Sequence, residues 1–148
     1  MKIIFLDIDG VLNSKRTYYA FKGYPIDLSN ESLKRFDWVA IGLIRKLCKL
    51  LDAQIVLSSS WRRCFKIEDI ALALNLPIID KTPILFSGTR GKEIELWINK
   101  NKDVSYCIID DNNDMLDYQK EHFVRTSHEN GFLLKDYYKV IKMFGGAL

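Results

Sequence analysis

The chain has 148 residues, of which 48% are hydrophobic and 28% are charged, a balance typical of one soluble globular domain. The net charge of +3 permits an anionic partner without requiring one. No apolar run reaches the roughly 20 residues of a membrane-spanning helix. The 3 widely spaced cysteines argue against a disulfide scaffold or a zinc ribbon. The first residues lack a signal-peptide cleavage site, so we expect no export, and the cysteines are then reduced thiols in a cytoplasm. We also expect a monomer with no membrane partner.

Short apolar runs alternate with segments of helical periodicity along the chain. The runs predicted as strands are 3–6, 54–57, 78–79, 105–109 and the weaker 122–125. The segments predicted as helices are 41–51, 67–76, 92–99, 114–121 and 135–144. This alternation predicts the α/β class, with a doubly wound, mostly parallel sheet and helices on both faces. No change in composition divides the chain, so we expect residues 1–148 to form one domain, with a flap insertion at about 14–39.

Polar side chains follow three of the predicted strands. The first strand ends in Asp7-Ile-Asp9-Gly, the second in three serines from Ser58, and the third in Asp110-Asp111. Because the carboxyl ends of parallel strands share one edge of a sheet, these side chains are expected to converge there. Crowded carboxylates repel one another unless a cation neutralises them, and hard oxygen ligands favour Mg²⁺ over Zn²⁺. An isolated Asp-x-Asp has a simpler alternative, a turn or helix cap, but three such strand ends together indicate a phosphate site.

These motifs, in this order, resemble those of the haloacid dehalogenase (HAD) superfamily of phosphatases and phosphotransferases. Phe5-Leu-Asp-Ile-Asp-Gly10 is similar to its first motif, Ile55-Val-Leu-Ser58 to its second, and Cys107-Ile-Ile-Asp-Asp111 to its fourth. The third motif is a lone basic residue, for which Lys92 fits and Arg90 competes. The stretches 58–62 (Ser-Ser-Ser-Trp-Arg) and 90–94 (Arg-Gly-Lys-Glu-Ile) carry a finer similarity, to the capless HAD domains of RNA-repair proteins and to polynucleotide 3′-phosphatase domains.

The resemblance implies a magnesium-dependent phosphatase that works through a covalent intermediate. Asp7 would attack phosphorus to form an aspartyl-phosphate, and Asp9 would protonate the leaving oxygen and later activate water. The metal ligands would be Asp7, the backbone carbonyl of Asp9 and Asp111, with Asp110 in the outer shell or in contact with Lys92. Asp114 is expected to cap the following helix.

The remaining site residues would bind the phosphoryl group or the substrate. Ser58 would hydrogen-bond the phosphoryl oxygens, with Ser59 as the alternative. Lys92 would stabilise phosphoryl charge, with Arg90 as its competitor for that role and otherwise a substrate contact. Arg62 is expected to contact a substrate phosphate, and a surface ion pair is its alternative.

The lengths of two segments bear on the substrate. Many HAD enzymes insert a cap domain over the site, but neither 14–39 nor 61–90 is long enough for one, so the site should be open. The segment 14–24 mixes basic and aromatic residues, as in proteins that hold single-stranded nucleic acid, although these rings could also pack on their own domain. With the likeness to repair phosphatases, this predicts a 3′-phosphate on a nucleic acid end as substrate. The runner-up substrate is a free nucleotide or another small phosphomonoester.

Two other classes of protein share some of these features. A receiver domain also uses a phosphorylated Asp, a Lys and Mg²⁺, but its paired acids end the first strand, whereas here they come late. A non-catalytic HAD-like binding module would be expected to have lost some of the acids or the basic residue, all of which are present. His122 and His128 have no partners at metal-ligand spacing, so we interpret them as ordinary polar residues.

Overall fold

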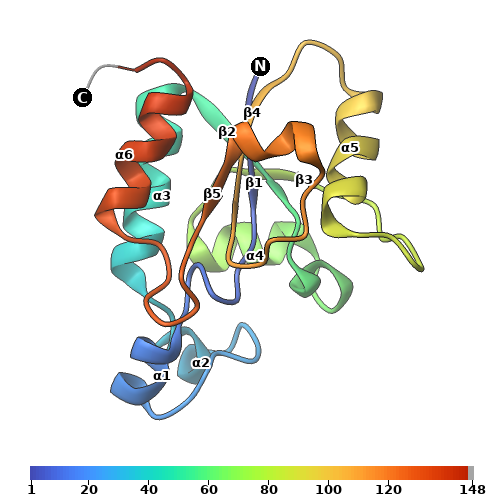
Figure 1. Ribbon diagram of the computed structural model, residues 1–148. Coiled ribbons are helices and arrows are strands. Elements are labelled where there is room, and N and C mark those ends of the chain that lie inside the picture. Colours follow the sequence, from blue (N-terminus) through green and yellow to red (C-terminus); the bar gives the residue numbers. More distant parts are fainter. Residues whose placement is uncertain (147–148) are drawn as a thin grey trace.

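In the computed structural model, which describes residues 1–146, a five-stranded parallel sheet runs through the centre of the protein (Figure 1). Its strands are β1 (Lys2–Leu6), β2 (Ala53–Leu57), β3 (Ile78–Lys81), β4 (Ser105–Asp110) and β5 (Phe123–Arg125), in the order β3-β2-β1-β4-β5. The chain builds outward from β1 to β3 and then returns past β1 to add β4 and β5. This reversal creates a topological switch point between β1 and β4, which is where such sheets bind ligands.

Helices cover both faces of the sheet, which confirms the predicted doubly wound α/β class. The larger apolar cluster joins the sheet to α3 (Trp38–Leu51), α4 (Ile67–Leu74) and α6 (Leu134–Met143), and the smaller one joins it to α5 (Arg90–Lys100). Figure 1 shows α3 and α6 together on one side of the sheet and α5 on the other. None of the helices in residues 1–146 has both the length and the apolar character needed to cross a membrane.

The first strand shows why the apolar runs of the sequence are strands. Ile3 and Phe5 point into the smaller cluster, whereas Ile4 and Leu6 point into the larger one. Side chains alternate between the two faces of a strand, and both faces are covered here, so every residue from Ile3 to Leu6 is buried.

The region predicted as a flap, residues 14–39, contains two short helices, α1 (Lys15–Phe21) and α2 (Asn30–Leu33). They lie beyond the carboxyl ends of the strands, at the lower left of Figure 1. No cap domain is present in residues 1–146, in agreement with the predicted capless type. That the region acts as a flap stays a prediction.

The predicted helix over 114–121 is wrong. Residues 113–116 have no regular structure, and a short 3₁₀ helix, η2, follows at Asp117–His122. The reason is that Asp114 caps the start of α5 and not the following helix: its carboxylate accepts the N–H of Arg90 at 3.1 Å, and its backbone oxygen accepts the N–H of Gly91 at 2.9 Å.

Gly91 allows this close approach between η2 and α5. A Cβ at this position would lie 2.7 Å from the backbone nitrogen of Leu116 and 2.6 Å from Oε1 of Gln119. The buried amide of Gln119 in turn donates to the carbonyl of Gly91 at 2.8 Å. A side chain at position 91 would therefore push the first turn of α5 away from the segment that caps it.

We expect Gly91→Ala to lower the free energy of unfolding by about 1–3 kcal/mol, the usual cost of overpacking. Gly42→Ala is the matched control, because Gly42 is also helical and a Cβ there would meet no neighbouring atom within 4 Å. The control should raise the free energy of unfolding by about 0.5–1 kcal/mol, since alanine restricts the unfolded chain and favours helix. Urea unfolding of both variants measures the difference, and equal values would show that the contact is not tight.

Candidate active site

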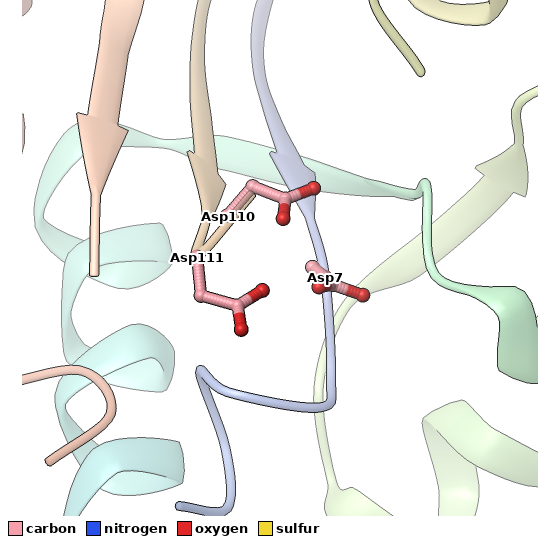
Figure 2. A group of neighbouring side chains, drawn as sticks. All are labelled: Asp7, Asp110 and Asp111. Carbon is pink, nitrogen blue, oxygen red and sulfur yellow. The ribbon is translucent and has the colours of Figure 1, made fainter. Parts of the chain in front are cut away.

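The carboxyl ends of β1 and β4 bring three carboxylates together (Figure 2). Asp7 follows β1, Asp110 ends β4, and Asp111 comes next in the chain. The sheet register pairs Leu6 with Ile109, so the residues after them lie side by side. One carboxylate oxygen from each of the three lies within 4.8 Å of the other two. The acid cluster thus sits at the switch point of the sheet.

Burial makes this cluster electrostatically unfavourable unless a cation balances it. Asp7 is 6% exposed and Asp110 is fully buried. Burial, and then repulsion from Asp110, hold the pKa of Asp7 well above its usual range, and the same two causes raise the pKa of Asp111. The three side chains offer only carboxylate oxygens. That donor chemistry fits Mg²⁺, a hard cation, and not the softer metals that prefer His or Cys.

Arg90, at the first position of α5, supplies positive charge to the cluster. Its Nη1 lies 2.7 Å from Oδ2 of Asp110 and 3.2 Å from Oδ1 of Asp7. Burial alone would lower the pKa of Arg90, but the two carboxylates raise it by more, so the guanidinium remains charged. The side chain of Lys92 is on the exposed side of the same helix. Its backbone N–H donates to the hydroxyl of Thr89, the N-cap residue. Of the two competing bases, the structure therefore brings Arg90 and not Lys92 to the acids.

Asp9 lies outside the group of three carboxylates and is exposed. The indole Nε1 of Trp61 donates to both of its carboxylate oxygens, at 3.1 and 3.2 Å, and Nδ2 of Asn13 donates to Oδ1 at 2.9 Å. Its carboxylate is therefore held in a fixed orientation at the surface, next to the acid cluster. The prediction that Asp9 binds metal through its backbone carbonyl stays a prediction.

Gly10 is required where it stands, directly after the Asp-x-Asp motif. Its φ of +81° is unfavourable for other residues, and a Cβ would lie 2.1 Å from Oδ2 of Asp111. Its carbonyl accepts the hydroxyl of Thr126 at 2.8 Å. The glycine thus lets the loop after β1 pass directly beside the acid that follows β4.

The two candidate serines differ in whether their hydroxyl groups have partners. Ser58 is fully buried, and within residues 1–146 its hydroxyl has no hydrogen-bond partner; its backbone N–H donates to Leu6, the residue before Asp7, at 3.0 Å. The hydroxyl of Ser59 instead accepts the N–H of Trp61 at 3.2 Å and caps the 3₁₀ helix η1 (Ser60–Arg63). Of the two alternatives, Ser58 is therefore the serine whose hydroxyl lacks a partner within residues 1–146.

Arg62 is placed in the interior of the protein. Its Nη1 donates to the carbonyls of Ser58 and Ser59, at 3.0 and 2.8 Å, and its Nε donates to Thr82 at 3.0 Å. Its Nη2 pairs with Glu93 at 3.1 Å, and this side chain is 2% exposed. Burial lowers the pKa of Arg62. Arg62 therefore links three segments through buried hydrogen bonds and a buried ion pair. The sequence had suggested a substrate contact or a surface ion pair, and this buried position differs from both.

Several residues that support the site were not predicted from the sequence. Trp61 and Glu93 lie inside the two stretches, 58–62 and 90–94, that carry the similarity to repair phosphatases. The sequence therefore pointed to these two residues but did not indicate what they do. Trp61 orients Asp9, and Glu93 holds Arg62. Thr126 gave no signal, because it approaches Gly10 from 116 positions away in the chain.

The parallel sheet, the Asp-x-Asp strand end and the late acid pair at the switch point are the arrangement expected of the HAD class. A protein-family model described as "HAD domain in Swiss Army Knife RNA repair proteins" matches residues 3–137. The chain therefore belongs to this family, which confirms the predicted resemblance and points to a HAD-type phosphatase. No curated protein and no solved structure matches the chain.

The raised pKa values predict how the stability of the metal-free protein depends on pH. Asp7 and Asp111 bind protons more tightly in the folded chain than in the unfolded one, where the pKa of Asp is about 3.9. Their contribution to stability is thus fully present below about pH 3.9 and is lost as the pH rises through the raised folded values.

We therefore expect Asp111→Asn to be more stable than the wild type near neutral pH and to lose less stability as the pH rises. The substitution removes one titrating group and one repulsive charge. Urea unfolding with a chelator present, from about pH 4 to pH 8, measures the effect. Asp117→Asn is the control, because the side chain of Asp117 is 99% exposed. Identical pH profiles for the wild type and Asp111→Asn would contradict the prediction.

Proposed function

We propose that the protein is a magnesium-dependent phosphomonoester hydrolase that acts through an aspartyl-phosphate on Asp7. The observation that supports this most is the cluster of Asp7, Asp110 and Asp111 with Arg90 at the switch point of the sheet. A binding module with no catalytic role would not need three clustered carboxylates, two of them buried, whose mutual repulsion costs stability.

In this proposal, Asp7 is the nucleophile. Arg90 contacts its Oδ1, so we assign the attack on phosphorus to Oδ2. The hydroxyl of Ser58 donates to a phosphoryl oxygen, which would give that buried hydroxyl the partner it lacks within residues 1–146. Asp7, Asp111 and the backbone carbonyl of Asp9 would hold Mg²⁺, and Asp110 would support them from beside Arg90. Bound Mg²⁺ would offset the repulsion between the carboxylates and the substrate phosphate.

Asp9 moves the protons in both halves of the reaction. As Asp7 bonds to phosphorus, the bond from phosphorus to the leaving oxygen breaks, and Asp9 gives that oxygen its proton. Asp9 then takes a proton from water, whose oxygen attacks the phosphorus, releases phosphate and restores Asp7. The bonds from Trp61 and Asn13 keep the carboxylate of Asp9 oriented for both transfers.

We further propose that the substrate is a nucleic acid end that carries a 3′-phosphate. The family described for RNA-repair proteins and the lack of a cap in residues 1–146 support this. The mild net charge of +3 favours the second candidate, a free nucleotide or other small phosphomonoester. The proposal places the protein in the cytoplasm, which the free thiols of Cys48, Cys64 and Cys107 support. It also includes a monomer.

The mechanism predicts that activity on a generic aryl phosphate needs both Mg²⁺ and Asp7. We expect Asp7→Asn to lower kcat by more than about 10³-fold, because the amide cannot act as nucleophile. Removing divalent metal with a chelator should abolish the activity, and adding Mg²⁺ back should restore it. Asp117→Asn serves as the control for the loss of one acid. Full activity of Asp7→Asn would contradict the covalent mechanism.

The position of Arg90 predicts which basic residue serves the phosphoryl group. We expect Arg90→Gln to lower kcat about 10²–10³-fold, the usual effect of losing a charge-stabilising donor. Lys92→Gln is matched in chemistry and lies two positions along the same helix, and its loss should be far smaller. Steady-state kinetics with the same aryl phosphate compare the two variants. If Lys92→Gln has the larger effect, the assignment is reversed.

A further inference from the structure

A cavity of about 270 Å³ opens beside the acid cluster. Asp9 and Asp111 line one part of it, and Lys15, Tyr24 and His128 line another. In the proposed mechanism, Asp9 gives its proton to the leaving oxygen. The group attached to that oxygen must therefore lie within reach of Asp9. Asp9 also lines a second cavity, of about 260 Å³, but Asp111 of the acid cluster lines the first and not the second, so we take the first as the space for that group. We call it the leaving-group cavity.

An aromatic surface is already in place at the leaving-group cavity. Tyr24, in the loop between α1 and α2, packs against Tyr18 of α1 with their ring centroids 4.8 Å apart. Both side chains are 41% exposed, so their rings remain available for a further contact. Half-exposed rings held together in this way are suited to stacking against a nucleobase.

Positive charge lies next to this aromatic surface. Lys15 is the first residue of α1, and its Nζ lies 3.3 Å from Glu129, with both side chains at least half exposed. His128 also faces Glu129, with its Nε2 at 3.7 Å. An exposed ion pair of this kind contributes at most about 1 kcal/mol, so a phosphate can displace the carboxylate from Lys15.

The wall of the leaving-group cavity is held by backbone hydrogen bonds between distant segments. The N–H groups of Lys15 and Arg16 donate to the carbonyls of His128 and Glu129, both at 3.0 Å. Gly131, with a φ of +70°, lets this loop approach the loop after β1, since a Cβ there would lie 2.9 Å from the carbonyl of Val11. The cavity is therefore formed by the domain itself, without a cap.

The volume and the lining residues of the leaving-group cavity bear on which group it can hold. Its volume of about 270 Å³ is slightly below the roughly 300–1,000 Å³ of pockets that enclose a whole small ligand. We infer that it holds the 3′-terminal nucleoside of a single-stranded nucleic acid, with the base on Tyr24 and Tyr18 and the adjoining phosphate at Lys15. This inference rests on the proposed phosphatase function and extends it to the recognition of the leaving group.

Binding to the Asp7→Asn protein, which cannot turn the substrate over, tests this assignment. The probe is a fluorescently labelled short single strand with a 3′-phosphate, measured by anisotropy in the presence of Mg²⁺. We expect Tyr24→Ala to weaken binding about 5- to 100-fold, the range found when a stacking ring is removed. Tyr24→Phe should restore it, because the ring remains. Tyr138→Ala is the control, since Tyr138 is similarly exposed on α6 and does not line the cavity.

Salt dependence tests the phosphate contact of Lys15. Lys15→Gln should weaken binding and lower the slope of log Kd against log salt by about 1, whereas Lys46→Gln on α3 should leave the slope unchanged. The assignment is overturned if Tyr24→Ala and Tyr138→Ala bind equally well, if no strand binds, or if the same strand with a 5′-phosphate binds as tightly.

Kinetics separate this inference from the proposed function. The readout is the ratio of kcat/KM for the 3′-phosphorylated strand to kcat/KM for an aryl phosphate, which Tyr24→Ala should lower about 5- to 100-fold. If the wild type hydrolyses the aryl phosphate through Asp7 but the ratio does not change, the leaving-group assignment alone fails. If Asp7→Asn is as active as the wild type, the proposed function fails whatever the binding results.

Discussion

The mutual repulsion of three clustered carboxylates, two of them buried, is the constraint on which the site depends. Asp7, Asp110 and Asp111 converge where β1 and β4 end. Apolar residues at these positions would stabilise the fold more than the three acids do. Arg90 offsets part of this charge by contacting two of the three. The start of α5 must therefore be held close to the sheet. Asp114 caps that end of the helix, and Gly91 leaves room for the capping segment.

A second, buried ion pair links the same helix to the end of β2. Glu93, one turn into α5, pairs with Arg62, and Arg62 holds the carbonyls of Ser58 and Ser59. Removing one partner of such a pair leaves an uncompensated charge and typically costs about 3–5 kcal/mol, so each residue requires the other. The Ser-Trp-Arg and Arg-Gly-Lys-Glu-Ile stretches thus meet in one buried contact.

The sheet and its acids could be predicted from sequence, because a strand buried on both faces leaves an unbroken apolar run and the acids follow it directly. Which of Arg90 and Lys92 contacts the acids could not be predicted, because the answer depends on where α5 begins. Each helical residue turns by about 100°, so a shift of two positions moves a side chain to nearly the opposite face. The predicted helix at 114–121 failed for a related reason: Asp114 caps a helix that begins 24 positions earlier.

The surface around the acids was the least predictable part, because it is assembled from the two ends of the chain. Thr126 contacts the loop after β1, and the loop at His128 contacts the first turn of α1. No local sequence pattern predicts either contact. This arrangement gives the domain a wall beside Asp9 without an inserted cap. In the proposed function, this wall would hold only the last residue of a nucleic acid strand. A few contacts, from Tyr24, Tyr18 and Lys15, would then be enough for recognition in a protein whose net charge is only +3.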